Sequence, residues 1–131
     1  MTLPNGAGGY QVGDGNLGEV TLGTSAIPTA YTAAGTLTTT DLAGGAVVYT
    51  SASTADLTLP AVSVVNADIS SAKVNSSFDF ALVATSTGVP TIVVGTGWTL
   101  VGVGTGVASR SVLFRAVKTS ATTYNLYRIA G

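Results

Sequence analysis

Few residues of this chain could carry out catalysis, and the nearest approach to a catalytic motif is Ser70-Ser71-Ala72-Lys73. It matches the S-x-x-K pattern of serine β-lactamases and penicillin-binding enzymes, in which the serine is the nucleophile. Lys118-Thr119-Ser120 is close to the K-T-G pattern of the same enzymes. The S-D-N motif expected between the two is missing, and a chain rich in Ser and Thr produces such short matches by chance. We therefore expect no catalytic centre here and predict that the protein is not an enzyme.

Two residue types on which many catalytic and metal sites depend are absent from the chain. The chain has no histidine and no cysteine, so it cannot build a Ser-His-Asp triad, a thiolate nucleophile or a His- or Cys-ligated zinc site. Its acidic residues are scattered, which predicts no facing pair of carboxylates for glycoside hydrolysis: Asp14, Glu19, Asp41, Asp56, Asp68 and Asp79. The segment 14–16 indicates a turn and not a calcium loop, because the alternating ligands of such a loop are missing. We predict no metal and no cofactor.

The composition indicates a folded protein with an almost uncharged surface. Hydrophobic residues make up 46% of the chain and charged residues 8%, against about 25% charged residues in ordinary domains. A disordered chain shows the opposite balance. With five Lys and Arg and a net charge of −1, the chain lacks the basic cluster that gains from counterion release. We therefore expect no nucleic acid partner.

One long uncharged stretch, between Asp79 and Arg110, raises the question of a membrane span. A spanning helix needs about 20 predominantly apolar residues, whereas this stretch is interrupted by Gly88, Pro90 and several further glycines. It is better explained by buried strands and turns, so we expect no membrane partner. The first residues have neither a basic region nor an apolar run, so we expect no signal peptide.

The alternation of apolar residues predicts an all-β fold. Thr and Val are β-branched and suit a pleated surface, and 17 glycines provide turns. Alternating patterns predict strands over 46–50, 56–60, 77–84, 91–94, 98–102, 111–118 and 123–129, with weaker signals at 20–22 and 36–38. A short helix or irregular turn is expected within 61–71. Six to eight short strands predict a single β-sandwich or jelly-roll domain of antiparallel strands over residues 20–131; no repeat of fixed period is visible.

The first 19 residues differ from the rest, because they are dense in glycine and almost without periodicity. Glycine loses much conformational entropy on ordering, so this segment needs a surface to pack on if it is to be fixed. Two interpretations stay open. It is either a frayed terminus or an extended arm that becomes ordered against a neighbouring subunit.

The aromatic residues of the second half predict either core packing or a contact between subunits. They are Phe78, Phe80, Trp98, Phe114, Tyr124 and Tyr127. Trp98 and the tyrosines could also form a sugar platform, since aromatic faces suit ligand contacts. Trp98, however, has no cluster of Asn, Gln, Asp and Arg near it in the sequence, as a sugar site usually would. We favour the core or the subunit contact.

The order of several segments resembles a known family. Residues 5–20 look like the start of small proteins found beside capsid genes in tailed bacteriophages, and segments 57–60, 77–80, 95–102, 114–119 and 124–128 are similar to the same group. The resemblance implies a head decoration (cement) protein that binds the outside of the major capsid protein lattice and stabilises the head. It further implies a homo-oligomer, more often a trimer than a dimer, made in the bacterial cytoplasm and located on the outer surface of the virion. The family offers no catalytic residues to carry over.

Together these observations lead to a hypothesis for the contacts. We expect the arm to bind the capsid through Asn5, Tyr10, Gln11, Asp14, Asn16, Leu17 and Glu19, and the strands from Phe78 onward to form the core and the oligomer contact. The alternative is a trimeric receptor-binding or fibre-tip module of a phage tail, which predicts a glycan ligand and an exposed aromatic patch. A third interpretation, a small β-rich hydrolase, would need a catalytic centre without histidine.

Overall fold

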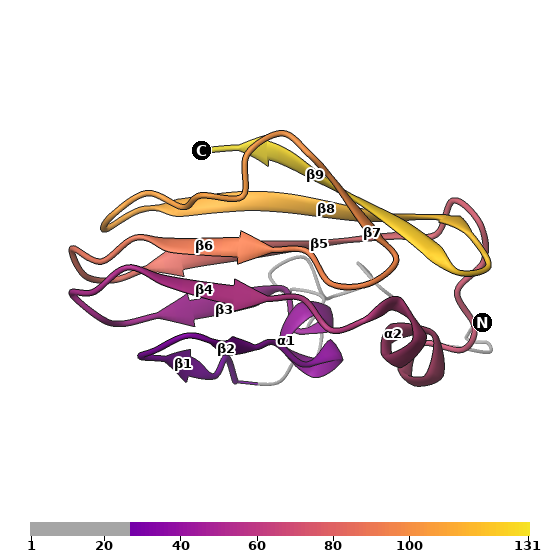
Figure 1. Ribbon diagram of the computed structural model, residues 1–131, viewed down its shortest axis with the longest axis horizontal. Coiled ribbons are helices and arrows are strands. Elements are labelled where there is room, and N and C mark those ends of the chain that lie inside the picture. The colour runs from indigo at the N-terminus through magenta and orange to yellow at the C-terminus, as the bar shows by residue number, and fades with distance from the viewer. Residues whose placement is uncertain (1–26) are drawn as a thin grey trace, which may run out of the picture.

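The computed structural model describes residues 27–131, so the predicted arm and its boundary at residue 19 lie outside it. The described part is mostly β, which confirms the predicted fold class (Figure 1). Its elements are β1 (Ala30–Tyr31), β2 (Gly35–Thr36), α1 (Thr39–Ala43), β3 (Ala46–Tyr49), β4 (Ala55–Thr58), α2 (Val62–Asp68), β5 (Ser77–Ala84), β6 (Pro90–Val93), β7 (Trp98–Val101), β8 (Ser111–Ser120) and β9 (Thr123–Ala130).

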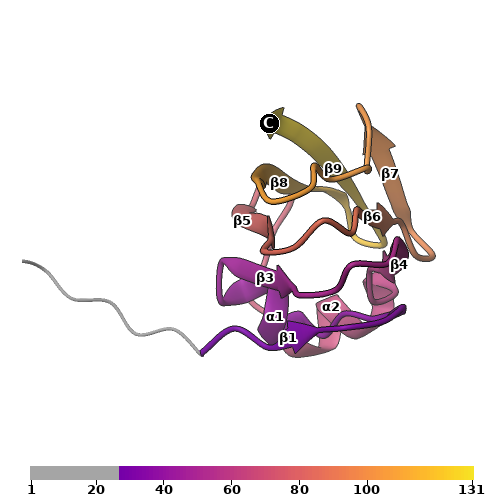
Figure 2. The same cartoon turned by 90° about the vertical axis from the view of Figure 1, so that its left-hand side faces the viewer.

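The strands form two sheets that face each other. The large sheet has six strands in the order β1-β3-β5-β8-β9-β7, and the small sheet has three in the order β2-β4-β6. From β1 to β6 the chain alternates between the sheets. Each strand from β3 to β6 therefore pairs in parallel with the strand two places earlier in the sequence. Figure 2 looks along the strands and shows β3 and β5 on one side and β4 and β6 on the other.

The antiparallel jelly-roll arrangement expected from the sequence is not confirmed, because five of the seven strand pairs are parallel. Antiparallel pairing is limited to β5 with β8 and β8 with β9. The physical reason is that alternation identifies the buried face of a strand but not its neighbour. The short turns at 32–34, 50–54 and 85–89 were compatible with hairpins, but they cross from one sheet to the other. A parallel pair needs such a crossover.

Successive turns also stack on one another. The amide of Gly88 donates to the carbonyl of Ser51 at 2.9 Å, and a Cβ placed on Gly88 would lie 2.2 Å from the same oxygen. Only glycine allows this approach of two backbones. The strands and turns from β1 to β6 therefore form a coil that repeats in space. The segments that connect its strands differ in length, so no fixed period appears in the sequence.

The helix α1 is fixed by a capping box that also holds the first strand. Thr38 Oγ1 accepts from the amide of Asp41 at 3.1 Å, and Asp41 Oδ2 accepts from the amide of Thr38 at 3.0 Å. The same carboxylate oxygen accepts a hydrogen bond from the hydroxyl of Tyr31 on β1. The buried Asp41 thus joins β1 to α1 at the outermost turn of the coil.

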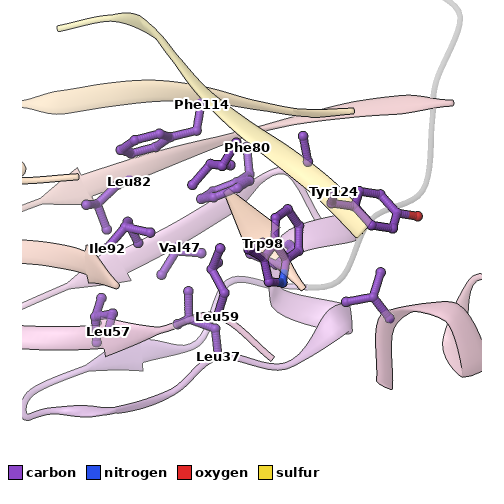
Figure 3. Packing of buried hydrophobic residues seen from close by; sticks show 14 of the residues in the cluster. Leu37, Val47, Leu57, Leu59, Phe80, Leu82, Ile92, Trp98, Phe114 and Tyr124 are labelled. Atoms are coloured by element: carbon purple, nitrogen blue, oxygen red, sulfur yellow. The ribbon is translucent and has the colours of Figure 1, made fainter. Parts of the chain in front are cut away.

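The hydrophobic core lies between the two sheets (Figure 3). Alternate residues of β5 and β8 enter it, among them Phe80 and Phe114, whose stacked rings lie 5.5 Å apart between centroids. Leu57 and Ile92 enter from the small sheet. At one end Trp98 closes the core, and its Nε1 donates to the carbonyl of Pro60 at 2.8 Å. The residues that enter the core from β5, β8 and β9 alternate along each strand, as the alternating patterns of 77–84, 111–118 and 123–129 predict.

The Asp41 junction makes stability depend on pH. Burial raises the pKa of Asp41, but hydrogen bonds from Tyr31 and Thr38 lower it, and the net result is a pKa below the usual value. Its contribution is therefore complete above about pH 4 and is lost as the pH falls through the folded pKa. We expect Asp41→Asn to cost about 1–3 kcal/mol at pH 7 and the difference from the unaltered protein to shrink in acid. Urea unfolding at several pH values measures this difference in the free energy of unfolding, with Asp56→Asn at an exposed position as the control. A difference between Asp41→Asn and the unaltered protein that stays constant down to pH 2 would contradict the role of the Asp41 carboxylate.

Candidate functional site

The residues predicted to contact the capsid cannot be located in the structure. All seven lie outside the described range 27–131, and their role stays a prediction from the sequence: Asn5, Tyr10, Gln11, Asp14, Asn16, Leu17 and Glu19.

The structure places the six predicted aromatic residues in different environments. Phe80, Trp98, Phe114 and Tyr124 are buried in the core, and Phe78 packs partly buried against it, 6.4 Å from Tyr124 between ring centroids. Tyr127 is the exception, because it lies on the opposite face of β9 and is half-buried. Of the two roles predicted for this set, core packing accounts for the first five residues, and Tyr127 is left for a contact.

Tyr127 belongs to a broad surface on the large sheet. We define the outer sheet face as the side of β3, β5, β8 and β9 turned away from the core. Side chains alternate along a strand, so this face carries Ala46, Val48, Asp79, Ala81, Val83, Leu113, Arg115, Val117, Asn125 and Tyr127. The members are partly exposed, with Asp79 and Arg115 the most open.

The apolar members of this face form rows across the strands. Val48 on β3 is the register partner of Val83 on β5. Ala81 is the partner of Ala46 on one side and of Leu113 on the other. Neighbouring side chains therefore shield one another at their flanks and stay partly exposed at their tips. Such a surface can bind another flat apolar surface.

One ion pair interrupts the apolar rows. Arg115 Nε lies 2.7 Å from Asp79 Oδ1, and Arg115 Nη2 lies 3.1 Å from Asp79 Oδ2. The two residues are direct cross-strand partners, and Tyr127 continues the row on β9. The hydrogen bond from Arg115 lowers the pKa of Asp79, and the same bond raises the pKa of Arg115. It is the only ion pair within residues 27–131, and it leaves the outer sheet face electrically neutral.

The sequence contained a signal for this face that its interpretation did not use. The strands β3 and β5 have apolar residues in both phases of their alternation, as Val47 with Val48 and Leu82 with Val83 show. Strands that are covered on both sides have this nearly continuous apolar pattern. Leu113, Arg115 and Val117 alternate with the buried Phe114 along β8 and therefore lie on the outer sheet face.

A cavity of about 270 Å³ lies at the other end of the strands from the turns of 85–89, beside α1 and the segment 69–77. Its walls include the rings of Phe78 and Tyr124 and the hydroxyl-bearing residues Ser71, Ser76 and Ser77. Burial raises the pKa of Tyr124, which keeps its hydroxyl neutral. None of the residues of the described part that line the cavity is ionised.

Next to this cavity, Lys118 is buried, and no carboxylate within residues 27–131 forms an ion pair with it. Its side chain is 8% exposed, and Nζ donates to Asn66 Oδ1 at 2.9 Å and to the carbonyl of Ala72 at 3.3 Å. The same ammonium group lies 5.8 Å from the centre of the Tyr124 ring, close enough for a cation–π contact. These contacts join α2 and the segment 69–76 to β8. The lysine of Lys118-Thr119-Ser120 therefore serves to hold the fold, while Lys73 of the S-x-x-K match is exposed.

The described residues also show how the remaining polar groups are distributed. No three His, Cys, Asp or Glu residues of the part from 27 to 131 come together as a metal site requires. Neither helix of this part has the length and apolar composition of a membrane span.

The chain was compared with known proteins in three ways. No protein family, no curated protein and no solved structure matches it.

The role of Lys118 can be tested by stability measurements. We expect Lys118→Met to cost about 1–3 kcal/mol, because it keeps the aliphatic stem but leaves the partly buried oxygens of Asn66 and Ala72 without this donor. The matched change Lys73→Met removes an exposed charge and should stay within about 0.5 kcal/mol. Urea unfolding of both variants gives the two values. Equal values would show that Lys118 does not hold α2 to β8.

Proposed function

We propose that this protein is a structural virion protein, a head decoration or cement subunit of a tailed bacteriophage. It binds the outside of the major capsid protein lattice, stabilises the head and is a homo-oligomer, more often a trimer than a dimer. The observation that carries the proposal is the outer sheet face, a broad and neutral surface suited to contacts with other proteins. The resemblance of segments 5–20 and 95–102 to small proteins encoded beside capsid genes supports the same function.

The physical requirements of decoration agree with such a subunit. A decoration protein gains its effect from many copies of a modest interface, because symmetry and multivalency multiply each contact. Ala, Val and Thr side chains have few polar groups to desolvate, so a surface made of them loses little when another protein covers it. The two facing sheets share one core, which makes the described part a firm body for such contacts.

We assign the grip on the capsid lattice to the arm, residues 1–19. This segment is rich in glycine and can follow the surface of a neighbouring protein once that surface compensates for its loss of entropy. The β-domain then remains available for contacts between copies. The residues of the arm then bind the capsid, and the residues of the β-domain bind other copies of the chain.

The tail-module alternative has less support. It predicts an exposed aromatic patch for a glycan, whereas none of the aromatic side chains within residues 27–131 is fully exposed. Phe80, Trp98, Phe114 and Tyr124 are committed to the core. The partly exposed Tyr127 has Arg115 as its cross-strand partner, and its hydroxyl accepts a hydrogen bond from Asn125 Nδ2 at 3.0 Å, so this hydroxyl is already engaged within the chain.

Binding to heads tests the proposed function. We expect the full-length protein to co-sediment saturably with expanded, DNA-free heads of the phage that encodes it. A variant without residues 1–18 should remain a folded oligomer and lose this binding. Decoration at full occupancy by the shortened protein would contradict the role of the arm. Binding of the full-length protein to host cells, with none to heads, would support the tail module instead.

A further inference from the structure

The strands under the outer sheet face have an unusual composition for a surface exposed to water. β5 lies between β3 and β8. The second half of β5 is apolar on both faces, with Phe80 and Leu82 inside and Ala81 and Val83 outside, whereas its first half carries Ser77 and Asp79 on the outer face. A sheet with one face in solvent normally alternates apolar with polar residues. Two-sided apolar strands are found where a second layer covers the sheet. The pattern therefore calls for a partner surface on this side.

The charges of the face indicate what that partner is. Asp79 and Arg115 are paired side by side, and their side chains are still 41% and 47% exposed. Nε and Nη2 of the guanidinium bind Asp79, so Nη1, with its two N–H donors, lies outside the pair. A second copy of the chain brings its own Asp79 and Arg115, so each guanidinium can meet a carboxylate of the other copy. The face is complementary to itself in charge.

The rest of the chain does not oppose such self-association. Its net charge is −1, so two copies repel each other only weakly. The apolar rows on both sides of the ion pair can pack against the same rows of a copy at the usual spacing of about 10 Å between stacked sheets. A partner with a strongly charged surface would gain less here, because one ion pair is all the charge that the face presents.

We propose that the outer sheet face is the contact between copies of this chain, with Asp79 and Arg115 as its complementary charges. The inference deepens the proposed function, since it names the surface that joins the subunits, and it rests on the homo-oligomer in that proposal. Because both copies use the same face, the contact is isologous and closes a dimer, so of the two oligomers named above it selects the dimer. It requires no capsid. A failure in solution is therefore separate from a failure to bind heads.

The test uses two charge reversals in the full-length chain, Asp79→Arg and Arg115→Asp. Each single variant presents two like charges to its copy, which is unfavourable across an interface. We expect each to self-associate about tenfold more weakly or worse, as measured by light scattering over a dilution series. An equimolar mixture of the two variants should recover the oligomer mass of the unaltered protein, because opposite charges then meet between chains.

The mixture separates contacts between chains from contacts within one. Inside each chain the like charges remain in the mixture, so recovery can come only from a contact between chains. The control is the double reversal in one chain, which restores both kinds of contact and should associate like the unaltered protein. Single variants that keep the full oligomer mass, or a mixture that stays dissociated, would overturn the proposal.

A second pair of variants keeps the test decisive if a charge reversal fails to fold. Val83→Lys places a charge in the middle of the outer sheet face, and Val103→Lys places it on a loop residue that is 58% exposed. Circular dichroism confirms that both are folded. We expect Val83→Lys to dissociate and Val103→Lys to keep the oligomer mass. The proposal would also be overturned by a folded Val83→Lys variant with unchanged oligomer mass, or by an unaltered protein that is a monomer at all concentrations. If Val83→Lys keeps its oligomer mass but no longer binds heads, the outer sheet face contacts the capsid instead.

Discussion

The two-sided apolar character of β5 is the constraint on which the rest of the structure depends. Its inner residues Phe80 and Leu82 need a second sheet to cover them, and the small sheet fulfils that need. Its outer residues Ala81 and Val83 have the same need, which no element within residues 27–131 fulfils. Burial of apolar area is the dominant favourable contribution to both folding and association. The same strand thus connects the stability of the subunit with its assembly.

The coiling of the chain follows from the first of these needs. Because β1 to β6 alternate between the sheets, every turn of the coil adds one strand to each wall and side chains from both to the core between them. The return paths carry α1 and α2, which Asp41 and Lys118 fasten to the strands through buried hydrogen bonds. The antiparallel pair β8 and β9 then extends the large sheet beyond the coil. This extension widens the outer sheet face without any additional charge other than Arg115.

Local patterns in the sequence were sufficient to find most strands but not their pairing. The segments 77–84, 98–102 and 123–129 were predicted within a residue or two of β5, β7 and β9, because alternation is a property of the strand alone. Parallel pairing depends on residues far apart along the chain, and turns that cross between sheets resemble hairpin turns. The five-residue α1 was missed, although Thr38 and Asp41 have the spacing of a capping box. The outer sheet face was missed because apolar residues were assigned to one core, whereas β3, β5 and β8 supply two surfaces.

The most direct measurement is the reactivity of a thiol placed on the outer sheet face. The chain has no cysteine, so Val83→Cys introduces a single reactive thiol. Val103→Cys provides a reference at a loop residue that is 58% exposed. The rate of maleimide labelling is followed while the protein is diluted. If copies meet through this face, Val83→Cys reacts slowly in the oligomer and faster on dilution, while Val103→Cys reacts at one rate throughout. A labelling rate for Val83→Cys that does not change between the oligomer and the dilute protein would contradict the account.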